Sequence, residues 1–74
     1  MVQLEIETAE GVWKPALRYD CVHDFAHRDR YNLQGDQDKG GIALPYSESL
    51  DFGDKDINDN WDIYRERFLR GDFP

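Results

Sequence analysis

Residues Arg18 to Tyr31 have the sequence RYDCVHDFAHRDRY, in which two alternating patterns are separated by a break. The second pattern places His27, Asp29 and Tyr31 on one face, with arginines on the other. The stretch Cys21 to Ala26 interrupts the alternation and is typical of a loop. We therefore expect the end of one strand, a loop and the start of an antiparallel neighbour, and we interpret the chain outward from this pair.

The segment before this pair predicts two strands. Apolar and polar side chains alternate over about residues 2–8, and the apolar face consists of Val2, Leu4 and Ile6. A connection at Ala9 to Gly11 leads to a second strand over about residues 12–20, with an apolar face of Trp13, Leu17 and Tyr19. Pro15 cannot donate a hydrogen bond to a neighbouring strand. We expect this strand to lie at an edge or to be bulged at the proline.

The segment after the pair predicts two more strands and a turn. The third strand covers about residues 27–34. The polar, glycine-bounded segment Gly35 to Gly41 (GDQDKGG) is typical of a turn. A short fourth strand then covers about residues 41–45 and stops at Pro45.

The period of the pattern changes near residue 48. Apolar residues then recur every three or four positions, which predicts a helix over about residues 48–70 with an inner face of Leu50, Gly53 or Asp54, Ile57, Trp61, Tyr64 and Phe68. Ser47 or Ser49 could cap its start, and Gly71 is a typical C-terminal stop. The predicted fold is α+β: a single domain, residues 1–74, in which a four-stranded antiparallel meander (β-β-β-β-α) packs on one long C-terminal helix.

Composition and charge narrow the functional classes. The chain has a formal net charge of −7 and one cysteine, Cys21, so it cannot form an intrachain disulfide. No apolar run approaches a membrane span and no basic leader precedes one, so we expect a soluble, cytoplasmic protein. The negative charge disfavours RNA as a partner and favours a basic protein. A small domain without disulfides often gains stability by oligomerising, which makes a homodimer a reasonable expectation.

Three patterns imitate metal sites but lack essential ligands. Asp54 to Asn58 resembles the start of an EF-hand loop, yet Asp59 and Arg65 stand where that loop needs glycine and a bidentate glutamate. Asp36 to Gly41 fails in the same way at its twelfth position, and a hairpin turn explains it better. His23 and His27 lie four apart, but that spacing joins two imidazoles only on a helix. We expect no metal ion and no other cofactor.

The polar residues of the opening stretch form the best candidate site. Histidine can act as general acid or base near neutral pH, arginine can stabilise a phosphorane, and a carboxylate can orient a histidine. The candidate catalytic residues are Arg18, Asp20, His23, His27 and Asp29. Arg30 could serve as a further cation. The same residues could instead form a protein-binding edge, or be structural residues whose polar groups are satisfied locally.

Two segments of the chain resemble a known group of proteins. The first runs from Arg18-Tyr19-Asp20 through His23, Phe25, His27 and Asp29, and resembles the RYD…H-x-F-x-H-x-D segment of small uncharacterised prokaryotic proteins. It is also distantly similar to the TumE-like toxins of type II toxin–antitoxin modules. The second segment, Trp61-Asp-Ile-Tyr64-Arg65, is similar to the W-x-x-Y-R segment of their later helix. The resemblance implies a toxin-like protein that acts on RNA and pairs with a helix-turn-helix antitoxin.

Two hypotheses follow for function. The first is a toxin-like protein with metal-independent, RNA-cleaving chemistry at the five candidate residues. The second is a non-enzymatic, acidic protein-interaction module that forms a homodimer. The relative placement of His23, His27, Asp20 and Arg18 discriminates between them, because side chains that converge favour a catalytic site.

Overall fold

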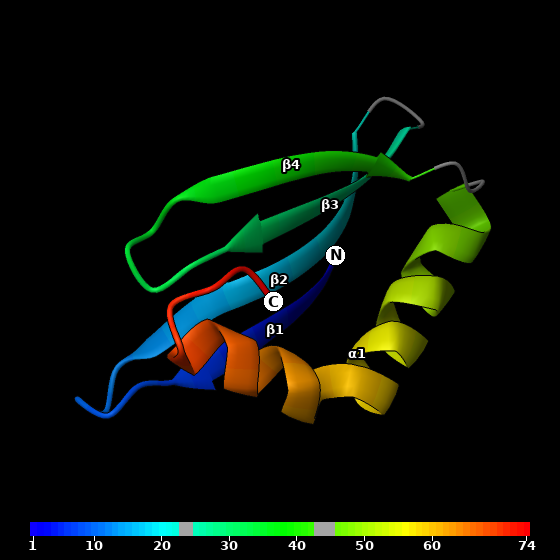
Figure 1. The fold of residues 1–74 in the computed structure, drawn as a ribbon. Coiled ribbons are helices and arrows are strands. Elements are labelled where there is room, and N and C mark those ends of the chain that lie inside the picture. The colour runs from blue at the N-terminus through cyan, green and yellow to red at the C-terminus, as the bar shows by residue number, and fades with distance from the viewer. Residues whose placement is uncertain (23–24, 43–45) are drawn as a thin grey trace.

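Four strands precede one helix in the computed structural model, which describes residues 1–22, 25–42 and 46–74. The elements are β1 (Val2–Glu7), β2 (Trp13–Val22), β3 (Phe25–Tyr31), β4 (Gln37–Ile42) and α1 (Tyr46–Leu69). The strands form one antiparallel sheet in the order β1-β2-β3-β4, as Figure 1 shows. The α+β meander with a long C-terminal helix is confirmed.

Several strand boundaries differ from the prediction, and β3 ends at Tyr31 rather than near residue 34. β4 runs from Gln37 to Ile42, so most of the segment predicted as a turn is extended and paired with β3. The turn lies earlier, where the Asn32 side chain and backbone bond to Asp36. The predicted loop at residues 21–26 is also too long, because Cys21 pairs with Ala26 in the ladder of β2 and β3. Glycine suggested a turn at Gly40 and Gly41, but cross-strand pairing stabilises both in extended form.

A bulge in β2 explains why one predicted face was wrong. Leu17 pairs with Leu4 and Pro15 pairs with Glu5, so Ala16 is an extra residue without a partner in β1. One extra residue reverses the alternation of side chains. Leu17 and Tyr19 are therefore buried, whereas Trp13 is 61% exposed. β3 pairs with β2 only from Leu17 onward, so Pro15 has a strand neighbour on one side, which its missing N–H tolerates.

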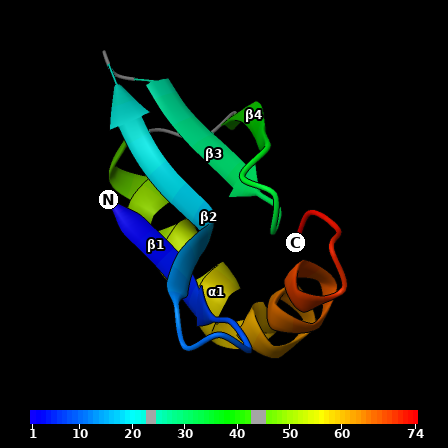
Figure 2. The same ribbon diagram turned by 90° about the vertical axis from the view of Figure 1, so that its left-hand side faces the viewer.

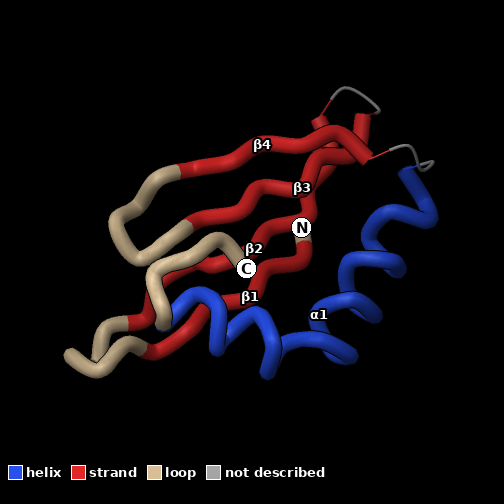
Figure 3. The backbone as a smooth tube through the Cα atoms, in the orientation of Figure 1, coloured by secondary structure: helices blue, strands red, loops and turns tan. Residues whose placement is uncertain are grey.

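Helix α1 covers one face of the sheet and packs mainly against β2 and β1. Figure 2 shows the helix on that side, with the opposite face of the sheet uncovered by any helix. Figure 3 shows that α1 bends near its middle. The side-chain amides of Asn58 and Asn60 donate to the carbonyls of Asp54 (2.8 Å) and Asp56 (3.1 Å). Bonds of this kind compete with the helical ladder and favour bending.

The two ends of α1 are held differently. At the start, Ser49 lies inside the helix rather than at its cap, and the Cys21 sulfur lies 3.1 Å from its hydroxyl oxygen. The side chain of Ser47, the other predicted cap, lies outside what the structure describes. At the end, Gly71 has a φ of 99°, and its N–H donates to the Phe68 carbonyl while that of Asp72 donates to Arg67. This is a Schellman motif, so the predicted stop is confirmed.

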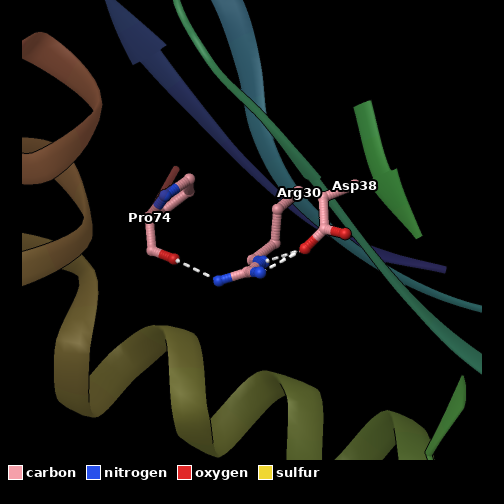
Figure 4. Close-up of polar contacts among 3 residues, drawn as sticks. All are labelled: Arg30, Asp38 and Pro74. Atoms are coloured by element: carbon pink, nitrogen blue, oxygen red, sulfur yellow. Dashed lines mark hydrogen bonds and ion pairs between the residues drawn. The ribbon is translucent and has the colours of Figure 1, made fainter. Parts of the chain in front are cut away.

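The core and the C-terminal tail close the covered face. Ile6, Ala16 and Phe68 form a buried apolar cluster between the sheet and the helix. Beyond the helix, the tail returns to β3 and β4 (Figure 4), where Arg30 pairs with Asp38 and donates to the Pro74 carbonyl at 3.5 Å. Within residues 1–22, 25–42 and 46–74, no helix combines the length and apolar character that a bilayer span requires.

Candidate functional site

The uncovered face of the sheet carries a row of polar side chains that crosses all four strands. Gln3 pairs with Arg18, Arg18 with Asp29, and Asp29 with Lys39. Directly opposite residues of an antiparallel ladder have Cβ atoms roughly 4.5–5.5 Å apart on the same face. Charges of alternating sign, Arg18, Asp29 and Lys39, therefore lie beside one another on three strands.

A second, shorter row lies next to the first. Asp20 pairs with His27, and His27 pairs with Gly41. Asp20, His27, Asp29 and Lys39 together line a shallow pocket of about 270 Å³. Gly41 has no side chain, and the space where its Cβ would point is open. The imidazole of His27 is therefore approachable from the side of β4.

Two side chains at the border of this pocket are oriented by their neighbours. The Arg18 Nε donates to the Gln3 Oε1 at 2.8 Å, and its guanidinium lies 5.8 Å from the centre of the Tyr31 ring. The Asp20 Oδ1 accepts the backbone N–H of Cys21 at 2.8 Å. These contacts restrict the rotamers of one cation and one carboxylate before any ligand binds.

The structure brings together four of the five predicted site residues. Arg18, Asp20, His27 and Asp29 share the open face, a placement that the sequence had left open. His23, the fifth, lies outside the described residues. Arg30 lies on the covered face and pairs with Asp38, so it is not available to this site. Lys39 was missed because its segment was interpreted as a turn; the alternation of Gln37, Lys39 and Gly41 opposite β3 was the signal.

Among the residues that the structure describes, no group of three or more histidine, cysteine, aspartate or glutamate side chains could hold a metal ion. The EF-hand-like segment on α1 has another role. Asp56 projects toward the sheet and accepts hydrogen bonds from the hydroxyls of Tyr19 and Tyr64, the latter at 2.7 Å and 2.9 Å. The Asn60 amide donates to the same carboxylate at 2.9 Å.

This tyrosine–aspartate cluster on the covered face should make the fold sensitive to alkali. Burial, followed by the hydrogen bond to the Asp56 carboxylate and its charge, raises the pKa of Tyr64 to about 12 and raises that of Tyr19 further. A phenol whose pKa is raised by folding contributes stability that is fully present below its unfolded pKa of 10. That contribution is lost as the pH rises through the folded pKa.

We therefore expect stability to fall between pH 10 and 12, with two of the four tyrosines ionising only as the chain unfolds. Tyrosinate absorbance and circular dichroism, followed together in one titration, measure this. Tyr64→Phe removes one of the two late-ionising groups and provides the control. If all four tyrosines ionised near pH 10 with the fold intact, the expectation would be wrong.

Comparison with known proteins places the chain in a family. The model of the domain of unknown function DUF7718 matches residues 1–74, so the chain belongs to the DUF7718 family. Neither the curated proteins nor the solved structures contain a match to it.

Proposed function

We propose that the protein is a toxin-like ribonuclease that cleaves RNA without a metal ion at the pocket on the open face of the sheet. The observation that carries this proposal is the cross-strand convergence of Asp20, His27, Asp29 and Lys39, with Arg18 beside them. The resemblance of the Arg18–Asp29 segment to TumE-like toxins supports the same assignment.

Each group has a role in this chemistry. His27, oriented by Asp20 or Asp29, takes the proton from a ribose 2′-hydroxyl, whose oxygen then attacks the adjacent phosphorus. Arg18 and Lys39 stabilise the negative charge that develops on the phosphorane oxygens. The bond from phosphorus to the 5′-oxygen breaks, and that oxygen takes a proton from the His27 imidazolium or from water. The products are a 2′,3′-cyclic phosphate and a 5′-hydroxyl.

The distribution of charge makes RNA binding compatible with a net charge of −7. Many of the exposed acids lie on α1: Glu48, Asp51, Asp54, Asp59, Asp62 and Glu66. This helix covers the other face of the sheet. At the pocket, the cations Arg18 and Lys39 balance Asp20 and Asp29. Glu5 and Glu7 lie on the same face of the sheet, but on β1, where they pair with Pro15 and Trp13. Since salt screens charges beyond roughly 8 Å at physiological ionic strength, the local balance weighs more than the net charge.

We expect His27→Ala to lower the rate of RNA cleavage by roughly 10²–10⁴-fold. Arg18→Ala should lower it by about 10²-fold, because one transition-state donor is lost. The assay follows end-labelled RNA in the presence of EDTA, and the chemistry of the new ends identifies the reaction. Growth inhibition on expression in cells provides a second readout of the same variants.

Matched variants separate chemistry from folding and from overall charge. Lys39→Ala should lower the cleavage rate, whereas Lys55→Ala, at an exposed position of α1 outside the pocket, should not. Thermal midpoints of all variants should stay near that of the parent, since these side chains lie outside the core. If the parent protein left RNA intact, or if His27→Ala cleaved at the parental rate, the proposal would fail.

A further inference from the structure

A groove runs along β1, which forms the edge of the sheet opposite to β4. It has a volume of about 260 Å³ and is lined by four successive residues of β1 and three side chains from elsewhere: Leu4, Glu5, Ile6, Glu7, Trp13, Trp61 and Arg65. Both tryptophans of the chain lie in it, and they are 61% and 51% exposed. Trp61 was predicted on the inner face of the helix, but it is half exposed and lines this groove beside β1.

We propose that this groove binds an extended, basic segment of another protein, which adds to the sheet as a strand beside β1. β1 is the first strand in the order β1-β2-β3-β4, so its outer edge has no strand neighbour among the described residues. An exposed strand edge presents unpaired N–H and C=O groups that an extended peptide can bond. Exposed tryptophans at such an edge are typical anchors for a partner.

Two acids, Glu5 and Glu7, and one cation, Arg65, line the groove, so its net charge is negative and favours a basic partner. Glu5 and Glu7 are exposed on one face of β1, and neither forms an ion pair with any residue that the structure describes. An added strand would alternate as β1 does. Its residues on that face would lie opposite the two glutamates, where lysine or arginine is favoured. Its other residues would lie on the side of Leu4, Ile6 and Trp61, where apolar side chains are favoured.

A second copy of the chain fits the same edge poorly. In a symmetric antiparallel pair of β1 strands, opposed residues share a face, so the pair centres on one residue. If the pair is centred on Glu5, the two Glu5 side chains are directly opposed. If it is centred on Leu4, the two Glu5 side chains are diagonal neighbours. If it is centred on Ile6, each Glu5 lies opposite a Glu7 of the other strand. Like charges directly opposed are destabilising, which disfavours the registers centred on Glu5 and Ile6, and each chain carries a net charge of −7 that opposes self-association in any register.

The test uses a capped seven-residue peptide in which lysine and valine alternate. Because both tryptophans line the groove, their fluorescence reports binding directly. We expect saturable binding of this peptide. A peptide with glutamate in place of lysine should bind at least ~10-fold more weakly, and so should one whose central valine is replaced by proline, because proline cannot pair with a strand.

Two charge-reversal variants complete the design. Glu5→Lys with Glu7→Lys should weaken the lysine peptide at least ~10-fold and improve binding of the glutamate peptide. Glu10→Lys with Glu66→Lys changes the net charge equally at exposed positions outside the groove and should leave binding unchanged. Circular dichroism checks that both variants fold.

Three results would each overturn the proposal. Equal binding of the proline peptide would mean that attraction is purely electrostatic. An equal loss of affinity for the lysine peptide in the Glu10→Lys, Glu66→Lys variant would mean that the net charge of the protein alone determines binding. Sedimentation of the parent as a dimer that Trp61→Ala dissociates would make a second copy the occupant of the groove.

Discussion

Gly53→Ala is expected to destabilise the protein, although the same change in most helices stabilises it. A Cβ at Gly53 would lie 2.6 Å from Cγ, 2.7 Å from Cδ2 and 2.8 Å from Cβ of Tyr19. Helix propensity favours alanine by about 1 kcal/mol, whereas overpacking a core costs about 1–3 kcal/mol. The atoms struck belong to the root of the Tyr19 side chain, so α1 or β2 must move.

The surroundings of Tyr19 make that movement costly. Tyr19 is 1% exposed, its ring packs edge-on against Phe52 with centroids 6.0 Å apart, and its hydroxyl donates a hydrogen bond to Asp56. We expect a lower free energy of unfolding for Gly53→Ala and a loss of about 3 kcal/mol or more for Gly53→Leu, measured by urea denaturation. Gly41→Ala is the control, since a Cβ there meets no atom within 4 Å. A stabilised Gly53→Ala protein would contradict the packing described.

The second large effect concerns the carboxylate between the two tyrosines. Asp56→Ala removes the acceptor for the Tyr19 and Tyr64 hydroxyls and leaves the former buried without it. A buried hydroxyl that loses its hydrogen-bond partner costs about 1–3 kcal/mol of stability, and the cost is at the upper end of this range when the lost partner was charged. We expect a loss of about 3 kcal/mol in the free energy of unfolding, with a smaller loss for Asp56→Asn, which retains one acceptor oxygen.

A double-mutant cycle isolates this interaction. In a Tyr19→Phe background the buried hydroxyl is gone, so Asp56→Ala should cost at least ~1 kcal/mol less than it does in the parent. Asp54→Ala, at an exposed position of the same helix, should change stability by less than ~0.5 kcal/mol. Equal costs of Asp56→Ala in both backgrounds would mean that the Tyr19 hydroxyl does not depend on Asp56.

The fold was largely predictable because its signals are local. Alternation in β1 and β3, the change of period near residue 48 and the stop at Gly71 all follow from neighbouring residues. β4 was misplaced because Gly40 and Gly41 have weak strand preference of their own, and only pairing with β3 holds them extended. Trp13 was misplaced because the bulge at Ala16 depends on the register with β1, which one strand's pattern does not contain.

The candidate site was predictable in part for the same reason. Alternation places Arg18 with Asp20 and His27 with Asp29, and the register between β2 and β3 then puts the two pairs on a common face. Lys39 depends on the register of β4, and the groove of Trp13 and Trp61 depends on how α1 bends across β1. Both are tertiary features, and the sequence pattern contained no local signal for the bend beyond its asparagines.

The extra residue in β2 lets one strand contribute to the core, to the open pocket and to the groove beside β1. After Ala16, odd-numbered side chains such as Leu17 and Tyr19 face the core and even-numbered ones such as Arg18 face the open pocket. Before Ala16 the alternation of side chains is reversed, so that odd-numbered Trp13 lies away from the core and lines the groove. The residues of β2 that belong to the proposed catalytic and partner-binding surfaces, Arg18 and Trp13, thus both avoid the covered face because of one extra residue. A ten-residue strand without that phase change would have had to leave a tryptophan inside the core or an arginine beneath the helix.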